Sequence, residues 1–384
     1  MRFAEALRAA GLGAIAEVKR RSPSAGDLRP DADAAALAAA FERAGAAAVS
    51  ILVDERFGGS WDDLRAARAA TGVPLLAKGF FSTRAHLEEA RWSGADAVLL
   101  LLRDLDDQSM VELLQTAVAL GLDALVEAHD AEELGRAVVL GADVIGINAR
   151  DLSTFRIDRE AQLQLVAKAP RERVVVAESG IVSRAQGAAA ELAGADAILV
   201  GSTLMRSADP PATLMQLISR PLVKVCGLTR QEDVAVAAEA GGDMAGFILA
   251  PESPRAAKEV LPVPETMLSV EVHVGEYDGQ AADLVQLYER QEGSVRGRNA
   301  VLLREGAPVA RVLDLPWDED DPDHIERARS AEGRVMLAGR LGPGNVRQAI
   351  EAVRPWAVDA ASRLEREPGI KDHDKVRAFV EAAR

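Results

Sequence analysis

Five charged residues in the first half of the chain stand within or directly after short apolar runs. They are two lysines and three glutamates, namely Glu17, Lys19, Lys78, Glu127 and Glu178. An ionised side chain among apolar residues costs free energy unless it is paired, hydrogen-bonded or used in chemistry. One such residue alone would indicate a structural ion network. Two amines and three carboxylates that converge on one place instead favour acid–base catalysis.

The runs that carry these residues recur at even spacing and are typical of buried strands. There are eight of them, at residues 14–19, 48–53, 74–80, 97–102, 123–128, 144–149, 174–179 and 197–202. Segments with helical periodicity lie between them, for example at 31–44, 84–93, 109–120, 131–140 and 185–193. This alternation predicts an α/β protein whose parallel strands close into a (β/α)₈ barrel. A doubly wound open sheet is the alternative, but the Gly-x-Gly-x-x-Gly turn expected after its first strand is absent.

The predicted barrel determines where the charged residues should meet. Active sites of such barrels lie at the C-terminal strand ends, where alternate strands contribute side chains to one layer. The five charged residues belong to the first, third, fifth and seventh runs. Polar and small residues that follow the sixth, seventh and eighth runs add candidate partners and a candidate phosphate site: Asn148, Arg150, Ser179, Gly180, Gly201 and Ser202. The glycines could instead serve only the turns, and the loop at 19–28 with Ser22 is either a mobile lid or a plain surface loop.

A second series of apolar runs follows a break at residues 206–220 that contains two prolines. The runs lie at 222–228, 244–250, 268–274, 283–287, 300–306, 310–315, 334–340 and 356–362. Between Val301 and Leu315 no room is left for a helix, and the segment LREGAP (303–308) is typical of a hairpin turn. We therefore predict two domains, residues 1–217 and 218–384, arranged as tandem TIM barrels of which the second is shortened or distorted.

Composition excludes several classes of function. The 384 residues are 48% hydrophobic and 4% aromatic and carry a formal charge of -15. This acidic globular composition disfavours a binder of nucleic acid or of an anionic membrane, although a local anion pocket stays open. One cysteine excludes an intrachain disulfide and a cysteine-cluster metal site. The N-terminal segment lacks a signal-peptide pattern and no apolar run is long enough to span a membrane, so we expect a cytoplasmic protein.

Histidines offer no clear site of their own. The five in the chain lie at positions 86, 129, 273, 324 and 373 and show no spacing for metal binding or triad chemistry. We expect them at the surface or in packing, and we expect chemistry without a metal or cofactor.

The first half resembles the indole-3-glycerol-phosphate synthases. The resemblance is carried by EVKRRSPS (17–24), LLAKGF (75–80), LVEAH (125–129), GINARDL (146–152), AESGI (177–181) and LVGSTLM (199–205). This family closes the indole ring of carboxyphenylamino-deoxyribulose phosphate with loss of carbon dioxide and water. The chain departs from the family at Gly79, where Asp is usual, and in the short segment before Ala14.

The same resemblance implies roles for individual residues. Lys78 would be the general acid of ring closure, and Glu127 and Lys19 would serve proton transfers. Glu17, Asn148, Arg150 and Glu178 would complete the polar site. The residues that would place the substrate and its phosphate are Ser22, Phe80, Ser179, Gly180, Gly201 and Ser202.

The second half resembles the phosphoribosylanthranilate isomerases. KVCGLT (224–229), GFILAPESPR (246–255), DLVQL (283–287), LAGRL (337–341) and PGIKD (368–372) carry the likeness. It implies Cys226 as general base of an Amadori rearrangement, Asp314 as general acid, Arg255 as a carboxylate clamp and Gly339 as part of a phosphate site. Cys226 could also be a small buried hydrophobe.

Several positions of the second half depart from that family. Arg340 follows Gly339 where a second glycine is usual, and Arg363 follows Ser362 where glycine is usual. Tyr288 replaces a histidine, and LPWDEDDPD (315–323) replaces a glycine-rich loop after Asp314. Loss of glycine removes close backbone approach to phosphate, although arginine itself binds phosphate.

Four functions stay open on these residues. The first is a bifunctional enzyme of tryptophan biosynthesis that acts on the two phosphorylated small molecules, carboxyphenylamino-deoxyribulose phosphate and phosphoribosylanthranilate. The second is a synthase with a decayed, non-catalytic second barrel. The third is another phosphate-binding barrel lyase or aldolase, and the fourth is a non-enzymatic sensor of a phosphorylated ligand. The oligomeric state stays open, and a monomer is compatible with the sequence.

Overall fold

The computed structural model describes residues 2–8, 11–22, 26–151, 154–290, 299–319 and 322–384. The chain divides into two compact units. The first comprises Met1–Val182 and Gly187–Ile218, and the second comprises Ser183–Gln186 and Ser219–Arg384. Part of the 19–28 loop, the end of the GINARDL motif and part of the segment after Asp314 lie outside the described residues.

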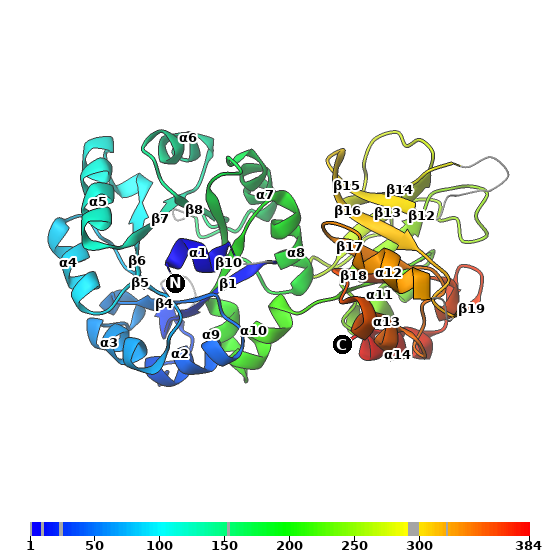
Figure 1. Cartoon of the computed structure of the whole chain (residues 1–384), viewed down its shortest axis with the longest axis horizontal. Helices are drawn as coiled ribbons and strands as arrows, with labels where there is room; N and C mark the ends of the chain where they lie inside the picture. The colour runs from blue at the N-terminus through cyan, green and yellow to red at the C-terminus, as the bar shows by residue number, and fades with distance from the viewer. Residues whose placement is uncertain (1, 9–10, 23–25, 152–153, 291–298, 320–321) are drawn as a thin grey trace. The chain divides into compact units, whose positions relative to one another are not determined.

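The first unit contains a closed barrel of eight parallel strands, drawn from blue to green in Figure 1. The strands are β1 (Gly13–Val18), β4 (Ala48–Leu52), β5 (Leu75–Lys78), β6 (Ala97–Leu101), β7 (Asp123–Ala128), β8 (Val144–Asn148), β9 (Val174–Glu178) and β10 (Ala197–Val200). A small hairpin, β2 (Arg21–Ser22) and β3 (Gly26–Asp27), follows β1. All eight predicted runs coincide with barrel strands, which confirms the predicted fold.

Helices alternate with these strands. They are α2 (Ala34–Arg43), α3 (Trp61–Ala70), α4 (Arg84–Trp92), α5 (Asp107–Leu120), α6 (Ala131–Val139), α7 (Arg159–Lys168), α8 (Arg184–Ala193), α9 (Ser202–Arg206) and α10 (Pro210–Ile218), with the 3₁₀ turns η1 (Glu55–Phe57) and η2 (Leu102–Asp104). Polar side chains cap several N-termini: for example, Asp130 accepts a hydrogen bond from Glu133 N at the start of α6. Gly94, Gly141 and Gly194 follow their helices at positive φ, where glycine is favoured.

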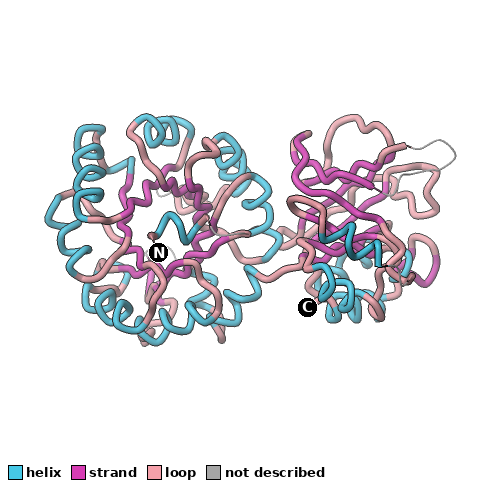
Figure 2. The backbone as a smooth tube through the Cα atoms, viewed as in Figure 1, coloured by secondary structure: helices cyan, strands magenta, loops and turns pink. Residues whose placement is uncertain are grey.

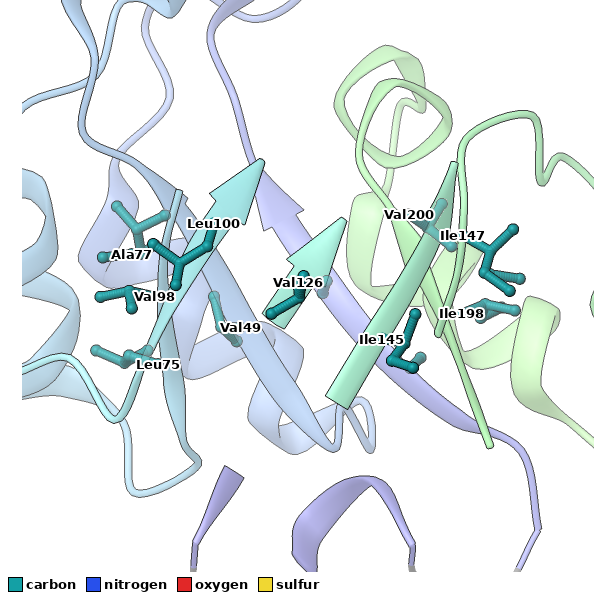
Figure 3. Packing of buried hydrophobic residues seen from close by; sticks show 14 of the residues in the cluster. Val49, Leu75, Ala77, Val98, Leu100, Val126, Ile145, Ile147, Ile198 and Val200 are labelled. Carbon is teal, nitrogen blue, oxygen red and sulfur yellow. The ribbon is translucent and has the colours of Figure 1, made fainter. Parts of the chain in front are cut away.

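Alternation along the strands separates an outer from an inner layer. Outward side chains such as Val49, Val126 and Ile198 belong to the apolar cluster between strands and helices (Figure 3). Inward apolar residues near the strand starts form a second cluster, which includes Phe3 and Leu7 of helix α1 (Phe3–Leu7). This short helix lies across the ring of strands in Figure 2. The inner apolar cluster therefore leaves the C-terminal strand ends for charged residues.

The second unit is also a closed eight-stranded barrel, but its topology is mixed. Its strands are β11 (Leu222–Cys226), β12 (Met244–Ile248), β13 (Leu268–Val274), β14 (Leu284–Tyr288), β15 (Asn299–Arg304), β16 (Ala307–Asp314), β17 (Val335–Ala338) and β18 (Ala357–Ala360). Strand β15 runs antiparallel to both β14 and β16, which confirms the predicted hairpin.

Few helices cover this second barrel. They are α11 (Gln231–Glu239), α12 (Pro322–Arg329), α13 (Val346–Val353) and α14 (His373–Ala382), with the turn η3 (Ser362–Leu364) and the hairpin β19 (Glu365–Glu367) and β20 (Ile370–Lys371). The described segments 249–267 and 275–283, which join β12 to β13 and β13 to β14, contain no helix. The barrel is thus shortened at more connections than the hairpin that the sequence indicated. Within the described part of the chain, no helix is long and apolar enough to cross a membrane.

Candidate active site

A cavity of about 400 Å³ opens at the C-terminal strand ends of the first barrel. Its lining contains every first-barrel residue predicted for the site except Glu178: Glu17, Lys19, Ser22, Lys78, Phe80, Glu127, Asn148, Arg150, Ser179, Gly180, Gly201 and Ser202. Glu178 lies beside Lys78. The fold therefore brings all the predicted residues of this half together, although it leaves their individual roles as predictions.

Lys78, the last residue of β5, is the central cation of the cluster. Its Nζ lies 2.9 Å from Glu178 Oε2 and 3.1 Å from Glu17 Oε2, and its side chain is 15% exposed. Burial opposes the charged amine, but Glu17, Glu178 and Glu127 outweigh it and raise the pKa of Lys78 above its ordinary value. Lys78 therefore reaches the cavity as an ammonium group.

Glu17 links two lysines. Its Oε1 lies 2.6 Å from Lys19 Nζ, while its Oε2 contacts Lys78. Burial disfavours the carboxylate, but Lys19 and Lys78 outweigh burial and lower the pKa of Glu17 to about 2. A Cβ at position 201 would lie 2.3 Å from Glu17 Oε1, so Gly201 leaves the space that this carboxylate occupies. Glu17 is thus a fixed anion that orients both amines.

Glu178 has the opposite tendency. It is almost fully buried, and burial together with the neighbouring Glu127 raises its pKa to about 7, although Lys78 acts against this shift. Beside it, Gly146 leaves room for the carboxylate, because a Cβ there would lie 2.1 Å from Glu178 Oε1. The cluster therefore titrates as a unit in which one carboxyl group exchanges its proton near neutrality.

Glu127 is the last inward-pointing side chain of β7, and two further side chains contact its carboxylate. Its Oε1 accepts a hydrogen bond of 3.0 Å from Asn148 Nδ2 and lies 3.2 Å from His129 Nε2. Burial raises the pKa of Glu127, but His129 and Lys78 outweigh it, so the net shift is downward. The expectation that His129 serves only the surface or packing is therefore corrected, because this ring contacts a proposed proton-transfer residue.

Small residues shape the far side of the cavity. Ser179 and Gly180 both have positive φ, 69° and 75°, at the turn after β9. Gly201 precedes α9, and the first two residues of that helix, Ser202 and Thr203, line the cavity. Such a turn and helix start present backbone N–H groups, which suit a phosphate.

A cation lies in the same cavity lining. Arg150 N donates to Asn148 Oδ1 at 2.9 Å, which ties the loop after β8 to the partner of Glu127. Burial and the nearby Arg206 lower the pKa of Arg150, because both disfavour its charged form. Ser22 of β2 is buried in the same lining.

Aromatic and cationic residues that the sequence analysis missed complete the cavity. Phe57 stacks on Phe80 with ring centroids 6.3 Å apart, and Phe155 and Arg103 also line the space. Arg103 follows β6, the fourth strand of the barrel, and Arg150 follows β8, the sixth. The argument that selected Arg150 as a site residue could therefore also have selected Arg103. Phe57 ends the 3₁₀ turn η1 and Phe155 lies in a loop, so no periodicity indicates which way their side chains point.

The second barrel holds a different cluster. Lys224 and Cys226 lie two apart on β11, and Lys224 Nζ contacts Gln286 Oε1 at 2.7 Å and Asp359 Oδ2 at 3.1 Å. Lys224 is fully buried. Burial raises the pKa of the Cys226 thiol, and Lys224 and Lys371 act against that rise. Lys224, Gln286 and Asp359 were not predicted, because a residue's neighbours across a barrel are not visible from spacing.

The other predicted residues of this half are engaged with protein partners. Arg255 Nε donates to both carboxylate oxygens of Glu365 at 2.8 Å. Tyr288 Oη donates to Asp314 Oδ2 at 3.1 Å. A Cβ at Gly339 would lie 2.7 Å from Asp314 Oδ1, so this glycine permits close approach to the proposed acid.

The two arginines that replace glycines share one carboxylate. Asp318 forms ion pairs with Arg340, at 3.3 Å, and with Arg363, and Arg340 also lies 3.1 Å from Glu319. Side chains of all four residues line a cavity of about 720 Å³ beside the ends of β17 and β18. The cations that could receive a phosphate are therefore already paired.

Comparisons with known proteins agree with both resemblances. The family model for indole-3-glycerol phosphate synthase matches residues 1–217, and the model for N-(5'phosphoribosyl)anthranilate (PRA) isomerase matches residues 321–382. The indole-3-glycerol phosphate synthases of Mycobacterium ulcerans and Streptomyces griseus are each 46% identical to this chain over 215 residues, covering 56% of it and 79% and 80% of those proteins. The solved structure of TrpF from Jonesia denitrificans is 26% identical and covers 43% of this chain and 97% of that one, with a TM-score of 0.34.

The family matches confirm the two halves that the motifs indicated, both related to enzymes of tryptophan biosynthesis. The synthase model spans more than half of the 384 residues, and it ends where the first unit ends. The Lys–Glu cluster lies wholly inside that match. This chain therefore belongs to the indole-3-glycerol phosphate synthase family, joined here to a part related to the PRA isomerases.

Proposed function

We propose that the first barrel closes the indole ring of carboxyphenylamino-deoxyribulose phosphate, and that the second barrel carries out the preceding isomerisation of phosphoribosylanthranilate. The observation that carries the first assignment is the geometry around Lys78. A buried ammonium group is held between Glu17 and Glu178 and still opens onto a cavity lined by aromatic rings and a phosphate-type turn.

The synthase reaction needs two protons delivered and one removed. A new carbon–carbon bond to the substrate carbonyl turns its oxygen into a hydroxyl group, which takes a proton from Lys78. Loss of carbon dioxide restores the aromatic ring. The hydroxyl group then leaves as water with a second proton, and a base removes one proton to complete the indole. Lys19 is the proposed donor of the second proton and Glu127 the proposed acceptor.

Binding follows from the chemistry of the lining. The apolar rings of Phe57 and Phe80 offer a surface for the aromatic part of the substrate. Arg150 is the cation suited to its carboxylate. Ser22 with the turns at Ser179–Gly180 and Gly201–Ser202 would hold the phosphate.

Steady-state kinetics on the full chain tests the first assignment. Purified protein should convert carboxyphenylamino-deoxyribulose phosphate to indole-3-glycerol phosphate, and Glu127→Gln should abolish most of this turnover without loss of folded protein. A sensor of a phosphorylated ligand would bind the substrate and release no carbon dioxide. An aldolase that uses a Schiff base would be trapped at Lys78 by borohydride, whereas a general-acid lysine gives no adduct.

For the second barrel, Cys226 is the proposed base and Asp314 the proposed acid. In the isomerisation the ring oxygen takes a proton from the acid and its bond to the amine-bearing carbon breaks to give an imine. The base removes the proton from the neighbouring sugar carbon to give an enolamine. The enolamine becomes the ketone when the amine-bearing carbon gains a proton and the hydroxyl group on the neighbouring carbon loses one. Lys224, whose pKa is raised chiefly because Asp359 outweighs burial, would stabilise a Cys226 thiolate. Assay of phosphoribosylanthranilate conversion by the full chain decides between an active isomerase and the alternative for this half, a decayed barrel without catalytic activity.

We further propose that the protein acts in the cytoplasm, on small phosphorylated molecules and without nucleic-acid or membrane partners. The acidic net charge of -15 supports this proposal. Complementation of two tryptophan auxotrophs, one lacking each activity, would test both halves together.

A further inference from the structure

A histidine and a second carboxylate adjoin Glu127. His129 Nε2 lies 3.2 Å from Glu127 Oε1, and His129 Nδ1 lies 3.0 Å from Glu133 Oε2. The first contact is too bent for a hydrogen bond, so it acts as a charge contact. The imidazole thus stands between two carboxylates, one in the cavity lining and one outside it.

Local structure holds this ring in place. His129 follows the last residue of β7, and Glu133 lies in the first turn of α6, whose N-cap is Asp130. Glu133 Oε2 also accepts a hydrogen bond of 2.7 Å from the backbone N–H of His129. The side chains of His129 and Glu133 are only 16% and 15% exposed. Two contacts from one carboxylate leave the ring little freedom to turn away from Glu127.

The charges around the ring favour its protonated form. Burial lowers the pKa of His129, but Glu127 and Glu133 outweigh it and raise the pKa to about 10. On the neighbouring turn η2, Arg103 and Asp104 lie 3.6 Å apart and pair with each other. Across the cavity, Lys78 faces Glu127 but is shared with Glu17 and Glu178. His129 is therefore a cation that contacts Glu127 but neither of the other strand-end carboxylates, Glu17 and Glu178.

We propose that His129, held by Glu133, is a positioning residue that orients the Glu127 carboxylate beside Asn148 and keeps it ionised as the proton acceptor of the synthase reaction. The role in turnover rests on the proposed function of the first barrel. Without the imidazolium, a carboxyl group as deeply buried as Glu127 would retain its proton at higher pH. Neither His129 nor Glu133 lines the cavity, so each acts through Glu127.

Kinetics of the full chain test the proposal through the acidic limb of the kcat/KM profile, which reports the proton acceptor of the free enzyme. His129→Gln should move this limb upward by about 1 pH unit or more, because an opposite charge has been removed from beside a carboxylate. Glu133→Gln should move it in the same direction by less. The matched control is Glu132→Gln, which removes the same charge from an exposed neighbour in α6 and should leave the profile unchanged.

Nuclear magnetic resonance of the imidazole groups supplies a measurement that does not depend on turnover. In the full chain, the resonance of His129, assigned by its loss in His129→Gln, should stay in the charged form above pH 8, and in Glu127→Gln it should titrate at lower pH. Titration near 6.5 in the unmodified chain, or a His129→Gln profile identical to that of Glu132→Gln, would overturn the proposal. If the unmodified chain forms no indole-3-glycerol phosphate, the proposed function fails, and the titration still decides the charge of His129.

Discussion

Each barrel places a lysine among the inward side chains of a strand, Lys78 at the end of β5 and Lys224 within β11, but surrounds it differently. In the first barrel, the Lys78 side chain is 15% exposed, lies among three carboxyl groups and lines a cavity. In the second, Lys224 is 0% exposed and is enclosed by Asp359 and Gln286. The same contrast holds for the outer cations, since Arg150 lines an open cavity while Arg255 is bound by Glu365. Two eight-stranded barrels of different topology therefore support one site with available charges and one whose charges are satisfied internally.

This difference shows that barrel closure alone does not make a site. A charge becomes available for catalysis when its partners hold it in position but leave one side open to substrate. Where protein carboxylates occupy every cation, a ligand must displace them, and binding is weaker by the energy of those pairs. Four substitutions test this difference between the two barrels.

The largest effect is expected from Lys78→Met. Removal of the general acid should lower kcat of the synthase reaction by about a thousandfold, as is usual for such groups. Steady-state formation of indole-3-glycerol phosphate measures this, with isomerase activity as an internal check on folding. Lys168→Met, on the exposed face of α7, is the matched control. Activity within about tenfold of the unmodified chain would remove Lys78 from the mechanism.

Cys226→Ser should lower isomerase turnover by about a hundredfold, because a hydroxyl group is a far weaker base than a thiolate. Synthase turnover in the same protein should not change. The comparison is clean because Cys226 is the single cysteine of the chain. If the unmodified chain already lacks isomerase activity, the second barrel is non-catalytic and only the first barrel acts as an enzyme.

Asp318→Asn should free Arg340 and Arg363 for the substrate phosphate. We expect the KM for phosphoribosylanthranilate to fall by about two- to fivefold, a modest change because exposed ion pairs contribute little free energy. Glu326→Gln, an exposed change of the same charge on α12, serves as control. An increase in KM would mean that Asp318 positions the arginines rather than competing with the phosphate.

The smallest effect concerns stability against pH. Because the folded pKa of Glu178 is raised to about 7, the folded chain keeps a proton that the unfolded chain has already lost. The free energy of unfolding therefore falls as pH rises from about 5 to 7, and this loss is complete above the folded pKa. The substitution Glu178→Gln removes this pH dependence of the unfolding free energy.

Thermal melts of both proteins should show this change as a difference. Between pH 5 and pH 8, the Tm of Glu178→Gln relative to the unmodified chain should rise by about 2 to 4 °C. Glu172→Gln, an exposed carboxyl group before β9, should give a constant difference. A constant difference for Glu178→Gln as well would show that the carboxyl group is ionised throughout.

Most of the fold was predictable because strands and helices repeat at different periods. The eight runs of the first half and the hairpin near Gly306 were both read from local patterns and turn residues. The missing helices between β12 and β14 were not predicted, because a segment without clear periodicity does not reveal what packs on it. The aromatic residues Phe57, in the short turn η1, and Phe155, in a loop, were not predicted for the same reason.

What the sequence determined by itself is which residues face the barrel interior, since side chains two apart on a strand share a face and odd strands share a layer. That rule predicts that Glu17, Lys78, Glu127 and Glu178 lie together. Only the tertiary structure decided their partners. Lys78 meets Glu178 at a separation of 100 residues, and His129 turns toward Glu127, because closure of the barrel and the first turn of α6 set those distances.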